Sequence, residues 1–551
     1  MSGIYKNIQC DNKEILDVTH LEHQTDVKNK FINHKEKGLI LYHQLGSGKT
    51  CTSYIIADEM LDRNLIEHVY IFSPGSLRQS WFTEYCDKCG FDKTRFTNKF
   101  TFITYNYHVG KHLPKTFSNT LVIIDEFHNL INSVKNFSKN AVEIYNKLIN
   151  SDCKILLLSG TPIYNSIIEF SLIGYLIKPS RFSDPRNLIT EDIIWNYENI
   201  FTFEDGKIII KNQDLFEDMF SDMISYFPGA GAEYIPKIIY HQPFKILMDE
   251  QHSMEYAYKH EKERIAASQM PPIGLKYSNP KLYNEKMQMV IMARKRIISR
   301  NASNFFYNGI DNTYMDDTDE ITTLPDLLTS EGGWVNDNIL KNGMLYKHSP
   351  KFALLLSNII QNLNQKHVVF SYFVNKSGIQ LIHTLLKKCG IQSLIFSGEL
   401  TDVKRRDVLK KFNSPDNTYA QKYKVLLVSE AGAEGINVLE TRHMHILESS
   451  PRMNKIVQAI GRVARYKSHN RLPLNERNVQ VWLYWSIGNP GDQYEIKIPK
   501  ENEKGELKIT VSTIAVPSEA VDQELYEKGM KVVNEINSFL DELKKLSVTN
   551  Y

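Results

Sequence analysis

The sequence has little net charge and no long apolar segment. Lysine and arginine number 66 against 64 aspartates and glutamates, so the formal charge is only +2 and no global basic field indicates nucleic-acid binding. Any nucleic-acid contact must then come from local clusters. No apolar run approaches the roughly 18 residues that a membrane span needs. The opening residues, MSGIYKNIQC, lack the basic and apolar regions of a secretory signal, so we expect a soluble intracellular protein.

Cysteine is also scarce. Six cysteines are scattered over 551 residues, which is typical of a reducing compartment. Cys86 and Cys89 form a single C-x-x-C, whereas a structural zinc site needs a second pair of cysteines or histidines at suitable spacing. Because no such pair is evident, we do not expect zinc. The length predicts several domains, roughly three or four.

One stretch, GLILYHQLGSGKT at 38–50, organises the rest of the chain. An apolar run suited to a buried strand leads into Gly46–Thr50, and a helical pattern follows. This arrangement points backbone N–H groups and the positive end of the helix dipole at one place, which favours phosphate binding. Lys49 adds a mobile positive charge, and the Thr50 hydroxyl can ligate magnesium. The full phosphate-loop pattern has glycine where this chain has His43, so an accidental glycine turn is the alternative.

Four short apolar runs follow and are predicted to be buried parallel strands: 68–72, 100–104, 121–124 and 154–158. Ligands of such sheets bind at the carboxyl ends of the strands, where the polar motifs of this chain fall. Asp125 and Glu126 follow one strand, and they suit a division of labour between holding magnesium and orienting the attacking water. Ser159 and Thr161 follow the next, and their hydroxyls could bond the acidic turn and sense the nucleotide.

Gln24 lies upstream of the phosphate loop. Its two-sided amide could read an adenine, and a surface glutamine is the alternative. A basic patch at 292–300, MARKRIISR, could track a phosphate backbone, or it could be a solvated helix face.

The second half repeats the alternation of strands and helices, with strands expected at 367–371, 392–396, 424–428 and 444–447. A helix is predicted over 454–466, and it carries Gln458, Arg462 and Arg465. The two arginines are three residues apart, so they share one helix face. Two fixed cations on one face suit arginine fingers that neutralise charge on a γ-phosphate, with a surface pair as the alternative.

Six motifs resemble, in order, those of superfamily 2 helicases and translocases: GSGKT (46–50), SPGSL (73–77), DEFH (125–128), SGTP (159–162), SEAGAEGIN (429–437) and QAIGRVAR (458–465). The sequence around these motifs looks like that of the branch that contains chromatin-remodelling ATPases and the poxvirus-type transcription ATPases. The latter are nucleoside triphosphatase I and the small subunit of the early transcription factor. DEFH differs from the DEAH common in remodellers and no chromodomain or bromodomain is visible, so the resemblance favours a large-DNA-virus member.

The resemblance implies the cofactors ATP and Mg²⁺ and a role for each matching residue. ATP would be bound by Gly46, Ser47, Gly48, Lys49, Thr50 and the adenine-reading Gln24, with Thr50 and Asp125 at the magnesium. Asp125 and Glu126 would handle magnesium and water, and Gln458, Arg462 and Arg465 would close over the γ-phosphate. Ser159 and Thr161 would couple the ATP state to nucleic acid, and Gly435 and Asn437 would contact nucleotide or strand.

The resemblance also predicts an α/β fold with two RecA-like parallel-sheet lobes. We expect an ATP-binding lobe at 1–228, a C-terminal lobe at 229–515 with a largely helical insertion at 262–345, and a C-terminal helix in 516–551. That helix is expected to pack on the second lobe, with a partner-binding helix as the alternative.

The predicted function is a nucleic-acid-dependent ATPase that acts on DNA, in preference to RNA, during viral transcription. An ATP-dependent RNA helicase is one alternative. A promoter-binding early transcription factor subunit, with ATP as a switch, is another. The expected partners are nucleic acid and either viral RNA polymerase or a second transcription factor subunit, with no membrane. If viral, the protein is expected in the virion and the host cytoplasm.

Overall fold

The chain folds into two units that are described separately. Unit 1 comprises Met1–Gly231 and Lys531–Tyr551, and unit 2 comprises Ala232–Met530. The computed structural model describes residues 4–5, 21–44, 47–74, 81, 89, 98–104, 113–163, 166–184, 197–229, 234–306, 344–375, 377–433, 436–488, 491–501, 507–517 and 519–549. Within these ranges no helix combines the length and the apolarity required to cross a bilayer.

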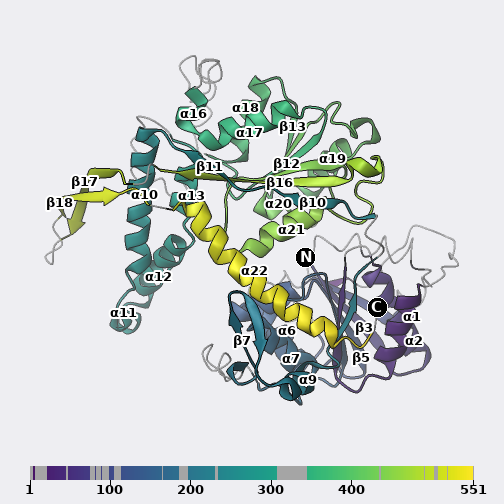
Figure 1. Cartoon of the computed structure of the whole chain (residues 1–551). Coiled ribbons are helices and arrows are strands. Elements are labelled where there is room, and N and C mark those ends of the chain that lie inside the picture. Colours follow the sequence, from purple (N-terminus) through teal and green to yellow (C-terminus); the bar gives the residue numbers. More distant parts are fainter. Residues whose placement is uncertain are drawn as a thin grey trace. The chain divides into compact units, whose positions relative to one another are not determined.

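Unit 1 is built on a seven-stranded sheet in the order β1-β4-β3-β5-β6-β2-β9. Figure 1 labels β3 and β5 of this sheet. All neighbouring strands are parallel except the pair of β1 and β4. The strands are β1 (Ile4–Tyr5), β2 (Gly38–His43), β3 (His68–Ser73), β4 (Phe100–Thr104), β5 (Thr120–Asp125), β6 (Lys154–Ser159) and β9 (Ile224–Phe227). The four strands predicted after the phosphate loop are therefore confirmed within two residues.

Helices cover both faces of this sheet because its strands are apolar on both sides. Along β5, Val122 and Ile124 pack with α5 (His128–Lys135), α6 (Lys139–Ile149) and α7 (Glu169–Ile177). The alternate residues, Leu121 and Ile123, pack with α1 (Glu22–Ile32) and α2 (Lys49–Asp62). The hairpin β7–β8 (Phe201–Glu204 and Lys207–Ile210) and α9 (Gln213–Phe220) complete the first of these layers.

Unit 2 contains a second parallel sheet, in the order β10-β16-β15-β12-β14-β13, with β11 also pairing with β16. The strands are β10 (Lys237–Tyr240), β11 (Phe244–Leu247), β12 (Lys366–Ser371), β13 (Ser393–Phe396), β14 (Val425–Ser429), β15 (Thr441–Ile446) and β16 (Asn478–Ile487). The fold class, α/β with two parallel-sheet lobes, is thus confirmed. Sequence reasoning did not identify β16, although it pairs with three other strands.

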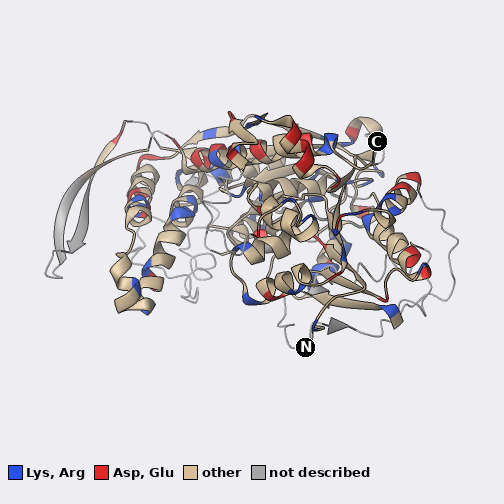
Figure 2. Cartoon of the chain, turned by 90° about the horizontal axis from the view of Figure 1, so that it is seen from below, with Lys and Arg blue, Asp and Glu red and all other residues tan. Residues whose placement is uncertain are grey.

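The helices of unit 2 are α10 (Glu250–Ser268), α11 (Ile273–Ser278), α12 (Pro280–Arg294), α13 (Ile297–Asn304), α16 (Met344–His348), α17 (Pro350–Gln361), α18 (Ile379–Lys388), α19 (Asp402–Phe412), α20 (Glu430–Ala433) and α21 (Met453–Val463). Among them, α11, α12 and α13 lie within the insertion at 262–345 that was expected to be largely helical. A long antiparallel ribbon, β17–β18 (Gln493–Glu501 and Leu507–Ala515), follows the sheet. Both signs of charge are interspersed along the described helices, in keeping with the near-zero net charge (Figure 2).

The last helix, α22 (Val521–Lys545), contributes to the cores of both units. Val521 and Leu525 pack with Met248 and Tyr256 of unit 2. Phe539 lies in the main core of unit 1, with its ring centroid 5.3 Å from that of Phe220. The expectation that this helix packs on the second lobe holds for its first half, whereas the apolar residues of its second half complete the core of unit 1.

A buried ion pair fixes the first turn of α22 within unit 2. Lys351 Nζ donates to Asp522 Oδ2 at 2.6 Å, and neither side chain is exposed to solvent. Asp522 Oδ1 also accepts from the backbone N–H of Ser449 at 3.1 Å, and Lys351 donates to Leu447 O at 3.0 Å. Buried charges are tolerated only when they are paired and hydrogen-bonded, as here.

One disulfide departs from the expected set of reduced cysteines. Cys51, in the first turn of α2, is bonded to Cys89, with 5.3 Å between their Cα atoms. Cys89 belongs to the C-x-x-C considered as half of a zinc site, and Cys86 lies outside the described residues. The bond closes a loop whose ends are 38 residues apart.

Reduction of this disulfide should destabilise unit 1. In the chain-entropy model a loop of this length contributes roughly 4 kcal/mol, and a dithiol reductant or Cys51→Ser should lower the melting temperature by roughly 10 °C. Differential scanning fluorimetry measures the shift. Cys389→Ser, which removes a free thiol of unit 2, is the matched control and should leave the reductant effect intact. The expectation would be contradicted if neither the reductant nor Cys51→Ser changed the melting temperature.

Buried histidines make the stability of unit 2 depend on pH. His367 Nδ1 lies 3.0 Å from His445 Nε2, and His445 Nδ1 lies 2.8 Å from the Tyr484 hydroxyl. Burial lowers the pKa of His367 to about 4, and burial followed by the two neighbouring histidines lowers the pKa of His445 well below its usual range. Both rings are therefore neutral in the folded protein at neutral pH.

Unfolding should consequently become easier as the pH falls below about 6.5, the ordinary histidine pKa. Below that pH the unfolded chain binds protons that the folded chain does not bind. Each such histidine then lowers the free energy of unfolding by up to about 1.4 kcal/mol per pH unit, until its folded pKa is reached. Urea unfolding at pH 7.5 and 5.0 measures the loss. His445→Gln should reduce the loss, while His34→Gln, at a partly exposed residue of unit 1, should not. Equal pH dependence in all three proteins would refute the assignment.

Candidate nucleotide-binding site

Four parallel strands of unit 1 end at the same edge of the sheet. In the strand register Tyr42 of β2 lies beside Ser159 of β6, and Asp125 of β5 lies beside Leu158. Phe72 of β3 lies beside Ile124. The phosphate loop, the acidic pair and the SGTP motif therefore emerge at one edge, as the sequence predicts.

The phosphate loop places Lys49 at the start of α2, with Gly48 in a left-handed conformation (φ +80°). The left-handed backbone favours glycine there, and a Cβ on Gly48 would lie 2.5 Å from Gln24 Nε2, so that amide would have to move. Lys49 Nζ donates to His43 O at 2.7 Å and to Gln44 O at 3.3 Å. Gly46 lies outside the described residues.

An orphaned hydroxyl shows that this loop suits an anion. Ser47 is 5% exposed, and its Oγ has no hydrogen-bond partner among the described residues. A buried hydroxyl without a partner is costly, and a phosphate oxygen would satisfy it. The loop N–H groups, the α2 dipole and the Lys49 ammonium add to the fit. The donor set therefore suits a nucleoside triphosphate.

Helix α1 supports the loop from its other side. Gln24 is 5% exposed, its Oε1 accepts from Leu21 N at 3.0 Å, and its Nε2 donates to Gly48 O at 3.4 Å. The alternative of a surface glutamine is therefore wrong. His23 Nε2 donates to Ser47 O at 3.0 Å, and its ring stacks on Phe227 with centroids 3.8 Å apart. Sequence reasoning missed His23, although it is the residue next to Gln24.

Asp125 is held by three donors. Trp81 Nε1 lies 2.5 Å from Asp125 Oδ2, Ser73 Oγ lies 3.4 Å from the same oxygen, and the N–H of Glu126 donates to Oδ1 at 3.0 Å. Burial, and then the charge of Glu126, raise the pKa of Asp125 to about 7. A divalent cation would offset this penalty, so the pair suits magnesium. Sequence reasoning did not identify Trp81 as part of this site.

Glu126 lies in a strained turn that other side chains stabilise. Its φ of +46° is in the left-handed region, which is unfavourable for a residue with a Cβ. Ser159 Oγ donates to Glu126 Oε2 at 3.4 Å, and His128 Nδ1 lies 3.4 Å from that oxygen and 3.2 Å from Ser159 Oγ. Thr161 reaches this group through its backbone, because its N–H donates to Ser159 Oγ at 3.0 Å. His128 completes DEFH and had not been assigned a role.

In unit 2, helix α21 carries Gln458 and Arg462 but ends at Val463, three residues earlier than predicted. Ser468 ends the helix, because its Oγ donates to Val463 O at 3.3 Å and accepts from Arg465 N at 3.2 Å. Arg465 therefore lies beyond the helix, and the argument that it shares a helix face with Arg462 is wrong. Nε and Nη2 of Arg465 are buried without a hydrogen-bond partner in the described part of the chain.

Two further residues, Asn437 and Gly435, were predicted to contact nucleotide or strand. Asn437 is exposed, and its backbone O accepts from Asn413 Nδ2 at 2.9 Å. Gly435 lies outside the described residues.

Two arginines of the basic patch at 292–300 are structural. Arg300 is 6% exposed, and its guanidinium lies 4.6 Å from the Tyr372 ring centroid and donates to Ser449 O at 3.1 Å. Arg296 lies 3.7 Å from Glu524 in an ion pair. Neither arginine is available to track a phosphate backbone, so that interpretation is wrong for both.

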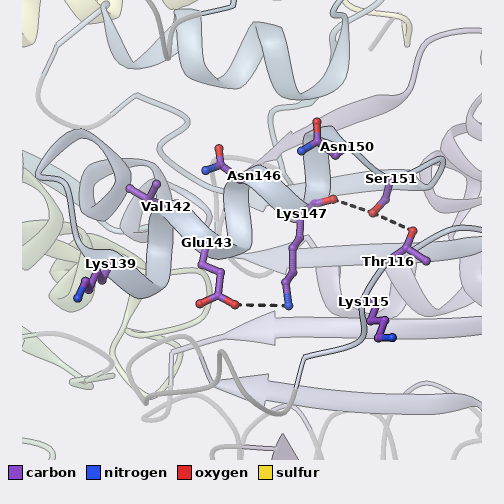
Figure 3. Close-up of a pocket in the computed structure, with 9 residues that line it drawn as sticks. All are labelled: Lys115, Thr116, Lys139, Val142, Glu143, Asn146, Lys147, Asn150 and Ser151. Atoms are coloured by element: carbon purple, nitrogen blue, oxygen red, sulfur yellow. Dashed lines mark hydrogen bonds and ion pairs between the residues drawn. The ribbon is translucent and has the colours of Figure 1, made fainter.

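A separate cavity of about 400 Å³ lies in unit 1, along α6 (Figure 3). Its polar wall includes Lys147, which pairs with Glu143 at 3.4 Å, and Thr116 and Ser151, which precede β5 and β6. The cavity is therefore next to the amino ends of these strands, opposite the edge that carries the phosphate loop. It contains none of the predicted site residues.

Comparison with known proteins agrees with these two halves. The model of the "Type III restriction enzyme, res subunit" matches residues 17–164, and that of the "Helicase conserved C-terminal domain" matches residues 350–467.

Three relatives from large DNA viruses align with most of the chain. Nucleoside triphosphatase I of Choristoneura fumiferana entomopoxvirus is 28% identical, over 90% of this chain and 78% of its own length. The termination factor NPH-I homolog of African swine fever virus is 24% identical, over 93% and 76%. A protein of Acanthamoeba polyphaga mimivirus, provisionally named an ATP-dependent RNA helicase, is 24% identical, over 83% and 81%. These matches confirm the resemblance to superfamily 2 helicases and the expected ATP-hydrolysing activity.

Trp81→Phe should slow ATP hydrolysis without weakening nucleotide binding. The variant keeps an aromatic ring but removes the donor to Asp125, and a hydrogen bond to a carboxylate at the reacting end of a site is worth about tenfold in kcat. Steady-state ATPase rates and ADP titration calorimetry measure the two effects. Trp485→Phe is a matched control, since the buried Trp485 Nε1 has no hydrogen-bond partner in the ranges that the structure describes. Equal rates for both variants would show that Trp81 does not position Asp125.

Proposed function

We propose that this superfamily 2 helicase-like nucleoside triphosphatase couples ATP hydrolysis to movement along nucleic acid, with DNA as its substrate, in viral transcription. The observation that carries the proposal is the shared edge of β2, β5 and β6, where Lys49, the acidic pair and Ser159 emerge together. The orphaned Ser47 hydroxyl supports a phosphate ligand there. The names nucleoside triphosphatase I and termination factor, borne by two relatives, support a role in transcription.

In this proposal, unit 1 binds ATP. The loop from Gly46 to Thr50 cradles the phosphates, Lys49 exchanges its two carbonyl partners for phosphate oxygens, and Gln24 reads the adenine. Thr50 and Asp125 hold Mg²⁺, which when bound neutralises charge between the phosphates. Glu126 orients the attacking water and accepts its proton, while Ser159 and His128 keep its carboxylate in place. Catalysis of this kind is mostly positioning and charge neutralisation.

Unit 2 supplies the cationic groups. We propose that Arg465, Arg462 and Gln458 act on the γ-phosphate when nucleic acid is bound. Two buried nitrogens of Arg465 have no partner among the described residues, and this supports the role because a buried guanidinium needs an acceptor. Ser159 and Thr161 transmit the nucleotide state, and Asn437 and Gly435 contact nucleotide or strand. The proposed partners are viral RNA polymerase or a second transcription factor subunit, in the virion and the host cytoplasm.

RNA is the alternative substrate, and the name of the mimivirus relative favours it. A promoter-binding factor that uses ATP as a switch is the other alternative. ATPase rates with single-stranded DNA, duplex DNA and RNA separate the first two. Stimulation by RNA alone would overturn the DNA proposal, and DNA affinity that appears only in complex with a second factor would favour the switch.

Three substitutions should each abolish the nucleic-acid-stimulated ATPase. Lys49→Ala removes a phosphate contact, Glu126→Gln removes the base, and Arg465→Ala removes a charge that in related chemistry is worth about 10³ to 10⁵ in rate. Stimulated kcat measures all three. Arg264→Ala, an exposed arginine paired with Glu261, is the control and should retain full activity. Turnover like that of the wild type in any of the three variants would remove that residue from the mechanism.

A further inference from the structure

The segment Ser547–Thr549, which follows α22, lies along β9 in unit 1. Val548 N donates to Ile224 O at 2.9 Å, and Tyr226 N donates to Ser547 Oγ at 2.9 Å. Thr549 Oγ1 donates to Tyr226 O at 3.3 Å. Strand β9 is the last in its sheet and pairs with β2, the strand that leads into the phosphate loop. Residues more than 300 positions apart in sequence thus meet beside the nucleotide site.

A chain of buried hydrogen bonds runs from this segment to Lys49. Thr549 Oγ1 lies 3.0 Å from Ser225 Oγ, and Ser225 Oγ lies 3.0 Å from His43 Nε2. The three side chains are at most 2% exposed. The backbone O of His43 then accepts from Lys49 Nζ at 2.7 Å.

The direction of these hydrogen bonds follows from what each group can donate. Burial lowers the pKa of His43 to about 3, with smaller contributions from Lys49 and His23, so the ring is neutral and carries one N–H. If Thr549 donates its proton to Tyr226 O, it accepts from Ser225, and Ser225 accepts from the N–H at His43 Nε2. Each of the two hydroxyls then donates once. Ser225 accepts from His43, and Thr549 accepts from Ser225 and also from Ser547 Oγ, which lies 3.1 Å away. Removing either hydroxyl leaves a buried polar group unpaired, which costs about 1–3 kcal/mol.

His43 stands where the phosphate-loop pattern has glycine, so this chain places a bulky polar ring beside the loop. We propose that Ser225 and Thr549 are positioning residues for ATP binding: they fix the His43 ring, and through the His43 carbonyl they set the position of Lys49. This inference rests on the proposed phosphate contact of Lys49. It assigns to Ser547–Thr549 a part in the nucleotide site that none of the helicase motifs contains.

Thr549→Val keeps the shape of the side chain and removes its hydroxyl. Because Lys49 contacts phosphate before hydrolysis begins, the expected change is a rise of about fivefold in KM for ATP and in the Kd for ADP, with kcat within about twofold of wild type. Ser225→Ala should give the same pattern, and Thr549→Ser should restore wild-type values. Steady-state kinetics and ADP titration calorimetry measure these constants, and melting temperatures verify folding of each variant.

Ser538→Ala is the matched control, because Ser538 Oγ on α22 accepts from Ile208 N at 2.8 Å and takes no part in the chain to His43. It should leave KM and the ADP Kd unchanged. Unaltered nucleotide constants in a folded Thr549→Val or Ser225→Ala protein would overturn the inference, as would a failure of Thr549→Ser to restore them. Lys49→Ala separates the two proposals. If Lys49→Ala binds ADP normally, the phosphate role itself is wrong; if it does not, while Thr549→Val is normal, only the positioning role is wrong.

Discussion

Hydrogen bonding between parallel strands in a fixed register is the constraint on which the nucleotide site depends. In this register Tyr42 lies beside Ser159 and Asp125 lies beside Leu158. Side chains from motifs far apart in the sequence are therefore brought together by strand pairing alone. Within that frame the turn at Glu126 is unfavourable by itself, and Ser159 and His128 hold it. The chemistry therefore needs the buried apolar strands as much as the polar residues that follow them.

Much of this arrangement could be predicted from the sequence. Apolar runs bounded by polar motifs marked four strands of unit 1, β3 to β6, within two residues, because fully buried strands read as continuous apolar segments. The end of α21 could not be predicted in this way, since it depends on Ser468 folding back on Val463. Strand β16 was missed, although it is an interior strand that pairs with β10, β11 and β15. Its sequence, NVQVWLYWSI, mixes apolar and polar residues in no single period.

The predictions that the structure overturned share one cause, which is tertiary contact. The basic character of 292–300 is real, but Arg300 is enclosed by Tyr372 and Ser449. At Gln24 only the alternative of a surface glutamine was overturned, because its amide joins α1 to the phosphate loop. Helix α22 was assigned to one lobe only. Its apolar periodicity predicts a buried face but does not identify the core in which that face packs. The contacts of Asp522 with Lys351 and of Phe539 with Phe220 show that its two halves serve different cores.

The contacts of Ser547–Thr549 with β9 have a second consequence, for the behaviour of the protein at high concentration. A terminal strand of a sheet presents unpaired N–H and C=O groups that can template pairing with another molecule. Here the N–H of Tyr226 donates to Ser547 Oγ, and the C=O of Tyr226 accepts from Thr549 Oγ1. The C=O of Ile224 accepts from the N–H of Val548. These three residues therefore cover the edge strand β9, which disfavours aggregation and strand exchange between copies of the protein.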